Sequence, residues 1–181
     1  GRIDAGGGFC SGVLIAPDLV LTAAHCLVDP RSGARLDPRQ VTFRAGLRDG
    51  EAVAERSGAR AVLHPDYRAV DPDGLRQLNA DVALMELDAP IPSDLAPPFA
   101  TATAPEAGGQ VSVVSYAAGR SEAPSWQREC GVAMKGQGAV VMTCDTHFGS
   151  SGAPVFEMSS GRPRIVSLIS RGMREGKHTI V

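Results

Sequence analysis

Short apolar or alternating segments, bounded by glycine, proline or aspartate, recur along the whole chain, and no long helical period is present. Such segments are typical of β-strands. They form two groups, separated by the proline-rich stretch 89–109. This stretch has neither the alternation of a strand nor the period of a helix. The first group is Val13–Ala16, Leu19–Ala23, Gln40–Gly46, Glu51–Glu55, Ala59–His64 and Asp81–Leu87. The second group is Gln110–Tyr116, Gln127–Met134, Ala139–Cys144, Ala153–Met158, Arg164–Ser170 and His178–Val181.

This arrangement predicts an all-β protein built from two six-stranded antiparallel β-barrels. Residues 1–88 would form the N-terminal barrel, residues 89–109 an extended linker, and residues 110–181 the C-terminal barrel. The composition suits a folded chain, because 43% of the 181 residues are hydrophobic and only 21% are charged.

The charge and the hydropathy argue against two classes of partner. A formal net charge of −2 gives no general attraction to nucleic acid or to an anionic membrane. No apolar run approaches the roughly 20 residues of a membrane span. The chain begins at Gly1 without a signal peptide, which fits a mature, trimmed or cytosolic chain.

The four cysteines bear on the choice of compartment. Cys130 and Cys144 are symmetric about Gln137, so a hairpin that turns there would set them opposite each other. Cys10 and Cys26 flank two apolar runs separated by Pro-Asp, and this second hairpin could return Cys26 towards Cys10. We expect two disulfides and an oxidising compartment, with four buried free thiols as the alternative. Zinc is less well supported, because no Cys-x-x-Cys or paired-histidine spacing exists.

Three residues are candidates for catalysis, although each also has an ordinary structural explanation. His25, in LTAAHC, follows an apolar strand and is either a buried histidine or a general base. Asp81, in NADVALMEL, is either a turn residue or the acceptor that orients an imidazole. Ser151, in GSSGAP, lies in a turn that is either a flexible loop or the site of a raised nucleophile.

Together and in this order, LTAAHC, NADVALMEL and GSSGAP resemble the trypsin/chymotrypsin-like serine protease family. HPDY at 64–67 and VSLISRG at 166–172 extend the resemblance over nearly the whole chain. It implies a secreted or periplasmic serine endopeptidase with its site between two barrels. Such an enzyme hydrolyses a protein or peptide substrate through an acyl-enzyme and needs no cofactor or metal.

The resemblance assigns the catalytic roles residue by residue. Ser151 matches the nucleophile, His25 the general base and Asp81 the residue that orients the base. Gly149 and Ser151 match the residues whose N–H groups form the oxyanion hole.

Further matches concern the surroundings of this triad. Ser170 matches the serine beside the triad aspartate, and Ser170, Arg171 and Gly172 match the strand that pairs with the substrate backbone. Cys10 and Cys26 match the disulfide that brackets the catalytic histidine.

Two residues depart from the pattern of the family. Ser150 stands where most animal members have an aspartate that pairs with a new N-terminal amine on activation. In this respect the chain is more similar to bacterial secreted members, including glutamyl endopeptidases, which have an uncharged residue there. Arg171 replaces the usual aromatic residue beside Ser170. The chain ends at Val181 without the closing helix of many relatives, so truncation is an open alternative.

The substrate preference is the least determined property. Asp145 matches the pocket-floor aspartate that selects Arg or Lys, or it simply hydrogen-bonds the turn after Cys144. His147, His178 and Arg171 could instead favour acidic residues. A catalytically impaired binding module and an esterase are the other open functions, and the sequence does not indicate an oligomeric state.

Overall fold

A computed structural model describes residues 1–69, 78–136, 138–158, 161–170, 173–175 and 178–180. Strands that contribute to a first sheet are β1 Arg2–Ala5, β2 Gly8–Ser11, β3 Val13–Ala16, β4 Leu19–Thr22, β5 Thr42–Ala45, β6 Ala54–Leu63 and β7 Ala83–Leu87. A second sheet contains β8 Gln110–Ala117, β9 Arg120–Gly136, β10 Ala139–Met142, β11 Pro154–Glu157 and β12 Arg164–Leu168. Two short 3₁₀ helices, η1 Ala24–Leu27 and η2 Pro38–Gln40, lie between β4 and β5, and β13 Met173–Glu175 pairs with β14 His178–Ile180.

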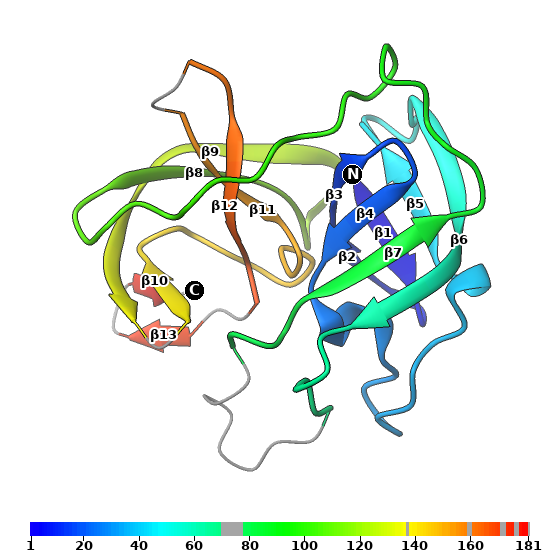
Figure 1. The fold of residues 1–181 in the computed structure, drawn as a ribbon, viewed down its shortest axis with the longest axis horizontal. Helices are drawn as coiled ribbons and strands as arrows, with labels where there is room; N and C mark the ends of the chain where they lie inside the picture. Colours follow the sequence, from blue (N-terminus) through cyan, green and yellow to red (C-terminus); the bar gives the residue numbers. More distant parts are fainter. Residues whose placement is uncertain (70–77, 137, 159–160, 171–172, 176–177, 181) are drawn as a thin grey trace.

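The two sheets are antiparallel and barrel-like, and they lie beside each other (Figure 1). The first has the strand order β2-β1-β5-β6-β7-β4-β3 and the second β10-β9-β8-β11-β12. The predicted fold class is therefore confirmed, although the strands divide seven and five between the sheets. The first sheet contains an additional hairpin of two four-residue strands, β1 and β2, whereas β6 is one strand where Glu51–Glu55 and Ala59–His64 are expected separately. The second sheet has five strands because β14, the last expected strand, pairs with β13 outside it.

Each sheet buries its own set of apolar side chains. In β5 the strand alternation is plain, because Phe43 and Ala45 are buried while Thr42 and Arg44 are half-buried. The first core includes Ile3, Val20, Val41, Phe43, Met85 and Ile91. The second includes Val111, Val113, Val132, Met142, Val155 and Ile169.

The segment 89–109 runs from one sheet to the other, between β7 and β8 in Figure 1. Its Ile91 is buried, and the Ile91 N–H donates to the Pro17 carbonyl at 2.8 Å. Its Phe99 donates from the backbone N–H to Leu14 O at 2.9 Å, and the Phe99 ring lies 4.9 Å from that of Phe156. The segment is thus fixed against both sheets, and it contains turns at 92–96 and 106–109. The division into two domains at this segment stays a prediction.

Both predicted disulfides are present. Cys10 and Cys26 have their Cα atoms 6.1 Å apart, and Cys130 and Cys144 have theirs 5.1 Å apart. The second bridge lies where the sequence places it, because β9 and β10 form an antiparallel pair in which Gly136 lies opposite Ala139. Among the described residues, the structure contains no helix of the length and apolarity that crossing a membrane requires.

Candidate active site

His25 and Asp81 meet because β4 and β7 are antiparallel neighbours. Thr22, at the end of β4, pairs with Ala83, at the start of β7. The residues just beyond these ends, in η1 and before β7, therefore come to the same edge of the first sheet. There His25 Nδ1 lies 2.7 Å from Asp81 Oδ2, and the His25 backbone N–H donates to Asp81 Oδ1 at 2.9 Å.

A third donor reaches Asp81 from the second sheet. Ser170, which follows β12, donates its hydroxyl to Asp81 Oδ2 at 2.5 Å. Asp81 is only 6% exposed, and burial by itself would raise the pKa of its carboxyl group. The hydrogen bonds and charge of His25, together with the Ser170 hydroxyl, outweigh this effect and hold the pKa below its ordinary value. Asp81 is therefore an ionised acceptor near neutral pH.

Ser151 lies in a turn that packs against the end of β4. Gly152 has a φ of +75°, and a Cβ on it would lie 2.2 Å from Thr22 Oγ1. Only glycine allows this approach, which brings the turn beside η1 and His25. No hydrogen bond joins Ser151 Oγ to His25 Nε2 within the described structure. Such bonds are often long before substrate binds.

The turn leaves two backbone N–H groups available. The Phe148 carbonyl accepts a hydrogen bond of 2.7 Å from the β8–β9 turn, and the Ser150 carbonyl accepts one of 2.9 Å from the N–H three residues later. Because a trans peptide unit points its C=O and N–H in opposite directions, the N–H groups of Gly149 and Ser151 point away from these partners. Neither N–H has an acceptor among the described residues. Backbone N–H groups without an acceptor are the kind of donor that stabilises an oxyanion.

Ser150, beside the nucleophile candidate, is satisfied locally. Its side chain is buried, with 1% of the residue exposed, and its hydroxyl donates to Ser115 Oγ at 3.2 Å. The same oxygen accepts from the His147 N–H at 3.3 Å. These contacts suit a serine, and they include no positively charged partner for a carboxylate.

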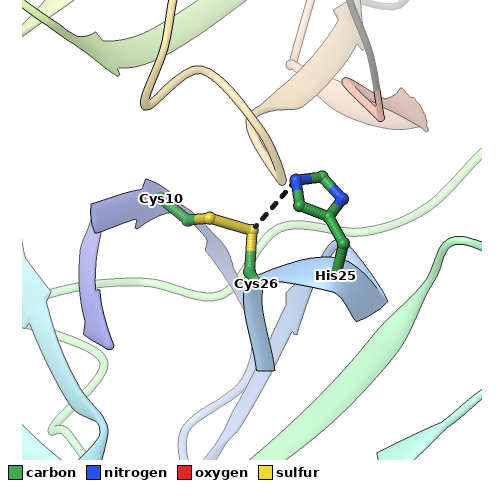
Figure 2. A group of neighbouring side chains, drawn as sticks. All are labelled: Cys10, His25 and Cys26. Carbon is green, nitrogen blue, oxygen red and sulfur yellow. Dashed lines mark hydrogen bonds between the residues drawn. A yellow bond between two sulfur atoms is a disulfide. The ribbon is translucent and has the colours of Figure 1, made fainter. Parts of the chain in front are cut away.

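The Cys10–Cys26 disulfide lies against the catalytic candidate (Figure 2). Cys26 Sγ is 3.9 Å from His25 Nε2, so the three side chains form a cluster with the spacing of metal ligands. However, the two sulfur atoms are bonded to each other, and a metal requires thiolates. The cluster is therefore better suited to fixing η1 against β2 than to holding a metal.

The residues predicted to contact substrate differ in where the structure places them. Asp145 is exposed, and its backbone N–H donates to Gln127 Oε1 at 2.8 Å. Ser170 donates its hydroxyl to Asp81. Arg171 and Gly172 lie outside the described residues.

One residue of the site, Ser11, is missing from the sequence-based prediction. Its hydroxyl donates to the Gly149 carbonyl at 2.9 Å, and its N–H donates to the Ser151 carbonyl at 2.8 Å. These partners are far away in the sequence, and the only local signal is that Ser11 follows Cys10.

Comparisons with known proteins agree with this geometry. Residues 10–164 match the family described as trypsin-like peptidase domain. A glutamyl endopeptidase of Bacillus licheniformis is 29% identical over 163 residues, which are 86% of this chain and 47% of that protein. A trypsin of Phaedon cochleariae is 32% identical over 104 residues, 57% of this chain and 36% of that one. The chain thus spans less than half the length of these curated relatives.

Among solved structures, that of a Glu endopeptidase in complex with MPD has a TM-score of 0.81 at 20% identity. The matched region covers 99% of this chain and 81% of the chain in that structure. This likeness supports the fold. Because the family match extends from Cys10 to Arg164, across both sheets and through Ser151, the chain belongs to the trypsin-like peptidase domain family.

Proposed function

We propose that the protein is a serine endopeptidase. The observation that carries this proposal is the placement of three parts at one junction of the sheets. The His25–Asp81 pair comes from the first sheet, whereas the turn of Ser151 and the Ser170 hydroxyl come from the second. A base, its orienting carboxylate and a serine with free N–H groups are the parts that acyl transfer requires.

The proposed reaction begins with attack by Ser151 Oγ on the scissile carbonyl carbon. His25 Nε2 takes the hydroxyl proton as the new C–O bond forms, and the carbonyl π electrons move to the oxygen. The Gly149 and Ser151 N–H groups stabilise this oxyanion. When the intermediate collapses, the C–N bond breaks and His25 gives its proton to the leaving amine. Water then repeats the sequence on the acyl-enzyme and releases the acid and the free serine.

Asp81 serves this reaction by fixing the imidazole. Its carboxylate accepts from the backbone N–H and from Nδ1–H of His25, so Nε2 is left as the basic nitrogen. The imidazolium that forms during attack is stabilised by the same buried negative charge.

For the substrate, we propose an acidic residue on the acyl side of the scissile bond. The glutamyl endopeptidase relative supports this preference. The expected choice of Arg or Lys rested on a buried Asp145, and the exposure of Asp145 weakens it. His147, which is exposed and near Ser151, is a candidate partner for a substrate carboxylate. Arg171 and His178 stay candidates from the sequence alone.

A set of fluorogenic peptides that differ only at this residue tests the preference. The informative pair is Glu against Gln, because the two side chains have nearly the same shape and differ in charge. We expect kcat/KM to be at least about tenfold higher for Glu, which corresponds to about 1.4 kcal/mol. A higher value for Arg or Lys would instead support the role of Asp145 in the pocket.

A labelled organophosphonate tests the enzyme class independently, because it modifies only an activated serine. Wild type should be labelled, and Ser151→Ala should not. An unlabelled wild type would indicate a catalytically impaired binding module. Labelling together with hydrolysis of esters but not of peptides would indicate an esterase.

We further propose that the protein acts outside the cytosol, in a secreted or periplasmic form. Its two disulfides support this location, because such bonds persist in oxidising compartments. Peptide mapping of protein from cells and from medium, without reduction, would test it. Recovery of the chain only from the cytosol would contradict the proposal.

A further inference from the structure

Ser11 lies at the end of β2 in the first sheet, yet its hydroxyl and its backbone N–H bond to the second sheet, whereas its carbonyl accepts from Thr22 Oγ1 of the first at 2.8 Å. It is only 1% exposed. Its Oγ–H donates to Gly149 O at 2.9 Å, its N–H donates to Ser151 O at 2.8 Å, and its Oγ accepts from the Tyr116 N–H at 3.0 Å. A single residue thus binds carbonyls on both sides of Ser150, from the opposite sheet.

We propose that Ser11 is a positioning residue that directs the oxyanion-hole N–H groups through its hydroxyl; this rests on the proposed function. The hydroxyl has one proton, and the Tyr116 N–H occupies one of its lone pairs. The proton therefore has a fixed direction, towards Gly149 O.

The need for such a partner follows from the conformation of Gly149. Its φ is +95°, and a residue without a side chain can rotate between several backbone conformations. The peptide unit from Gly149 to Ser150 is fixed at both ends, because Ser11 binds its C=O and His147 O accepts from its N–H at 2.9 Å. The Gly149 N–H belongs to the preceding peptide unit, whose Phe148 carbonyl accepts from the Ala118 N–H at 2.7 Å. With the units on both sides of Gly149 held, rotation at this glycine is restricted and the direction of its N–H is defined.

Phe9 restricts the same glycine from the same strand. A Cβ on Gly149 would lie 2.1 Å from Phe9 Cε2, so the ring occupies the space beside the glycine. The Arg2 guanidinium lies over this ring, 5.4 Å from its centroid. These contacts limit translation of the turn, whereas the Ser11 hydroxyl specifies which way its peptide unit faces.

The effect of removing the hydroxyl should appear in the transition state. The oxyanion exists only there, so misdirected N–H groups lower kcat and leave substrate binding nearly unchanged. We expect Ser11→Ala to lower kcat by about 10- to 100-fold with KM within about threefold. This is less than the effect of deleting a donor, which is about 10²- to 10³-fold, because the N–H groups are still present.

The experiment compares Ser11→Ala and Ser11→Thr with Ser112→Ala. Ser112 is a matched control, because it is also 1% exposed and its hydroxyl has no hydrogen-bond partner in the described structure. Active-site titration gives the competent fraction of each protein. The measurements are kcat and KM on one peptide ester, and the affinities for a peptide boronic acid and for the corresponding peptide acid.

The proposal predicts that Ser11→Ala loses kcat and boronic-acid affinity in parallel, keeps its affinity for the peptide acid, and recovers in Ser11→Thr. An unchanged kcat per titrated site, or equal losses for both inhibitors, would overturn it. If Ser11→Ala does not fold, Ser11→Thr and Ser11→Val give the comparison, since their shapes match and only one has a hydroxyl. Failure of both Ala and Val to fold would assign the hydroxyl to general stability, which also overturns the proposal. An inactive, unlabelled wild type would refute the proposed function instead.

Discussion

Ser170 donates a hydrogen bond of 2.5 Å to Asp81 Oδ2, across the junction of the two sheets. The same oxygen accepts from His25 Nδ1. The second sheet therefore supports the Asp81 carboxylate of the first, in addition to supplying the nucleophile candidate. Ionisation of Asp81 should then be linked to the stability of the whole arrangement.

The Ser170→Ala variant tests this link through acid unfolding. The folded pKa of Asp81 lies below its ordinary value of 3.8, so its ionisation stabilises the fold above about pH 4. This stabilisation is lost as the pH falls through the folded pKa. Removing one donor raises the folded pKa and reduces the contribution, by about 1.5 kcal/mol for a hydrogen bond to a charged group.

Urea unfolding between pH 6 and pH 2 measures the effect. Ser170→Ala should be less stable than wild type at pH 6, and the difference should shrink as the pH approaches 2. Ser112→Ala serves as the control, because its difference from wild type should not depend on pH. A constant difference for Ser170→Ala would separate Ser170 from the ionisation of Asp81.

Ser150 and Ser151 should respond very differently to the same substitution. Ser151→Ala should lower turnover by at least about 10⁴-fold, because it removes the attacking oxygen. Ser150→Ala removes a buried hydroxyl that bonds to Ser115, so it should destabilise the fold by about 1–3 kcal/mol yet keep most of the turnover. The measurement is kcat/KM per folded protein. An inactive Ser150→Ala with an active Ser151→Ala would show that the nucleophile is misassigned.

The sequence predicts those parts of the fold that depend on local patterns. The β3–β4 hairpin follows from two apolar runs around Pro-Asp, and the β9–β10 hairpin follows from glycines around Gln137. β1 and β2 are not predicted, because Gly6–Gly8 resembles a loop rather than the turn of a hairpin. β6 is predicted as two strands, since polar residues around Gly58 interrupt the alternation, whereas the structure continues through them.

The residues of the site, like the strands, can be predicted from the sequence only where a local motif marks them. His25, Asp81 and Ser151 can be found because each lies in a recognisable local motif. The role of Ser11 depends on a contact with Gly149 across 138 positions of the chain, and no local pattern encodes a contact of that range. The hydroxyl of Ser11 meets Gly149 only when the two sheets are folded against each other.

Gly152 should tolerate no side chain, because it packs directly against residues of the first sheet. A Cβ there would lie 2.2 Å from Thr22 Oγ1 and 2.3 Å from Ser11 O, and the φ of +75° disfavours any L residue. Gly152→Ala should destabilise the fold by about 1–3 kcal/mol from overpacking, in addition to about 1–2 kcal/mol from the left-handed backbone.

Gly119→Ala isolates the backbone contribution. Gly119 has a φ of +81°, and a Cβ there would meet nothing within 4 Å. In urea unfolding, both variants should lose the free energy that comes from the left-handed backbone. Only Gly152→Ala should also lose the free energy that comes from overpacking, and only this variant should have fewer titratable active sites. Equal losses would mean that the turn can move away from β4 without consequence.

The two disulfides can be compared directly, because they close loops of nearly the same length at different places in the fold. Their sequence separations are 16 for Cys10–Cys26 and 14 for Cys130–Cys144. For loops of this length, we expect the free energy of unfolding to fall by about 3 kcal/mol when either bridge is removed by a double Cys→Ala substitution. The free energies of unfolding should therefore fall by similar amounts.

Catalysis should separate the two bridges. Cys26 belongs to η1 with His25, and Cys10 precedes Ser11 in β2, so the first bridge joins the base to the strand that contacts the Ser151 turn. Its removal should lower kcat per folded protein more than removal of Cys130–Cys144, which lies at the base of the β9–β10 hairpin. The comparison uses kcat on a peptide ester, at a temperature where both variants are folded by circular dichroism. If the two variants lost kcat equally, the Cys10–Cys26 bridge would stabilise the fold without positioning His25 relative to Ser151.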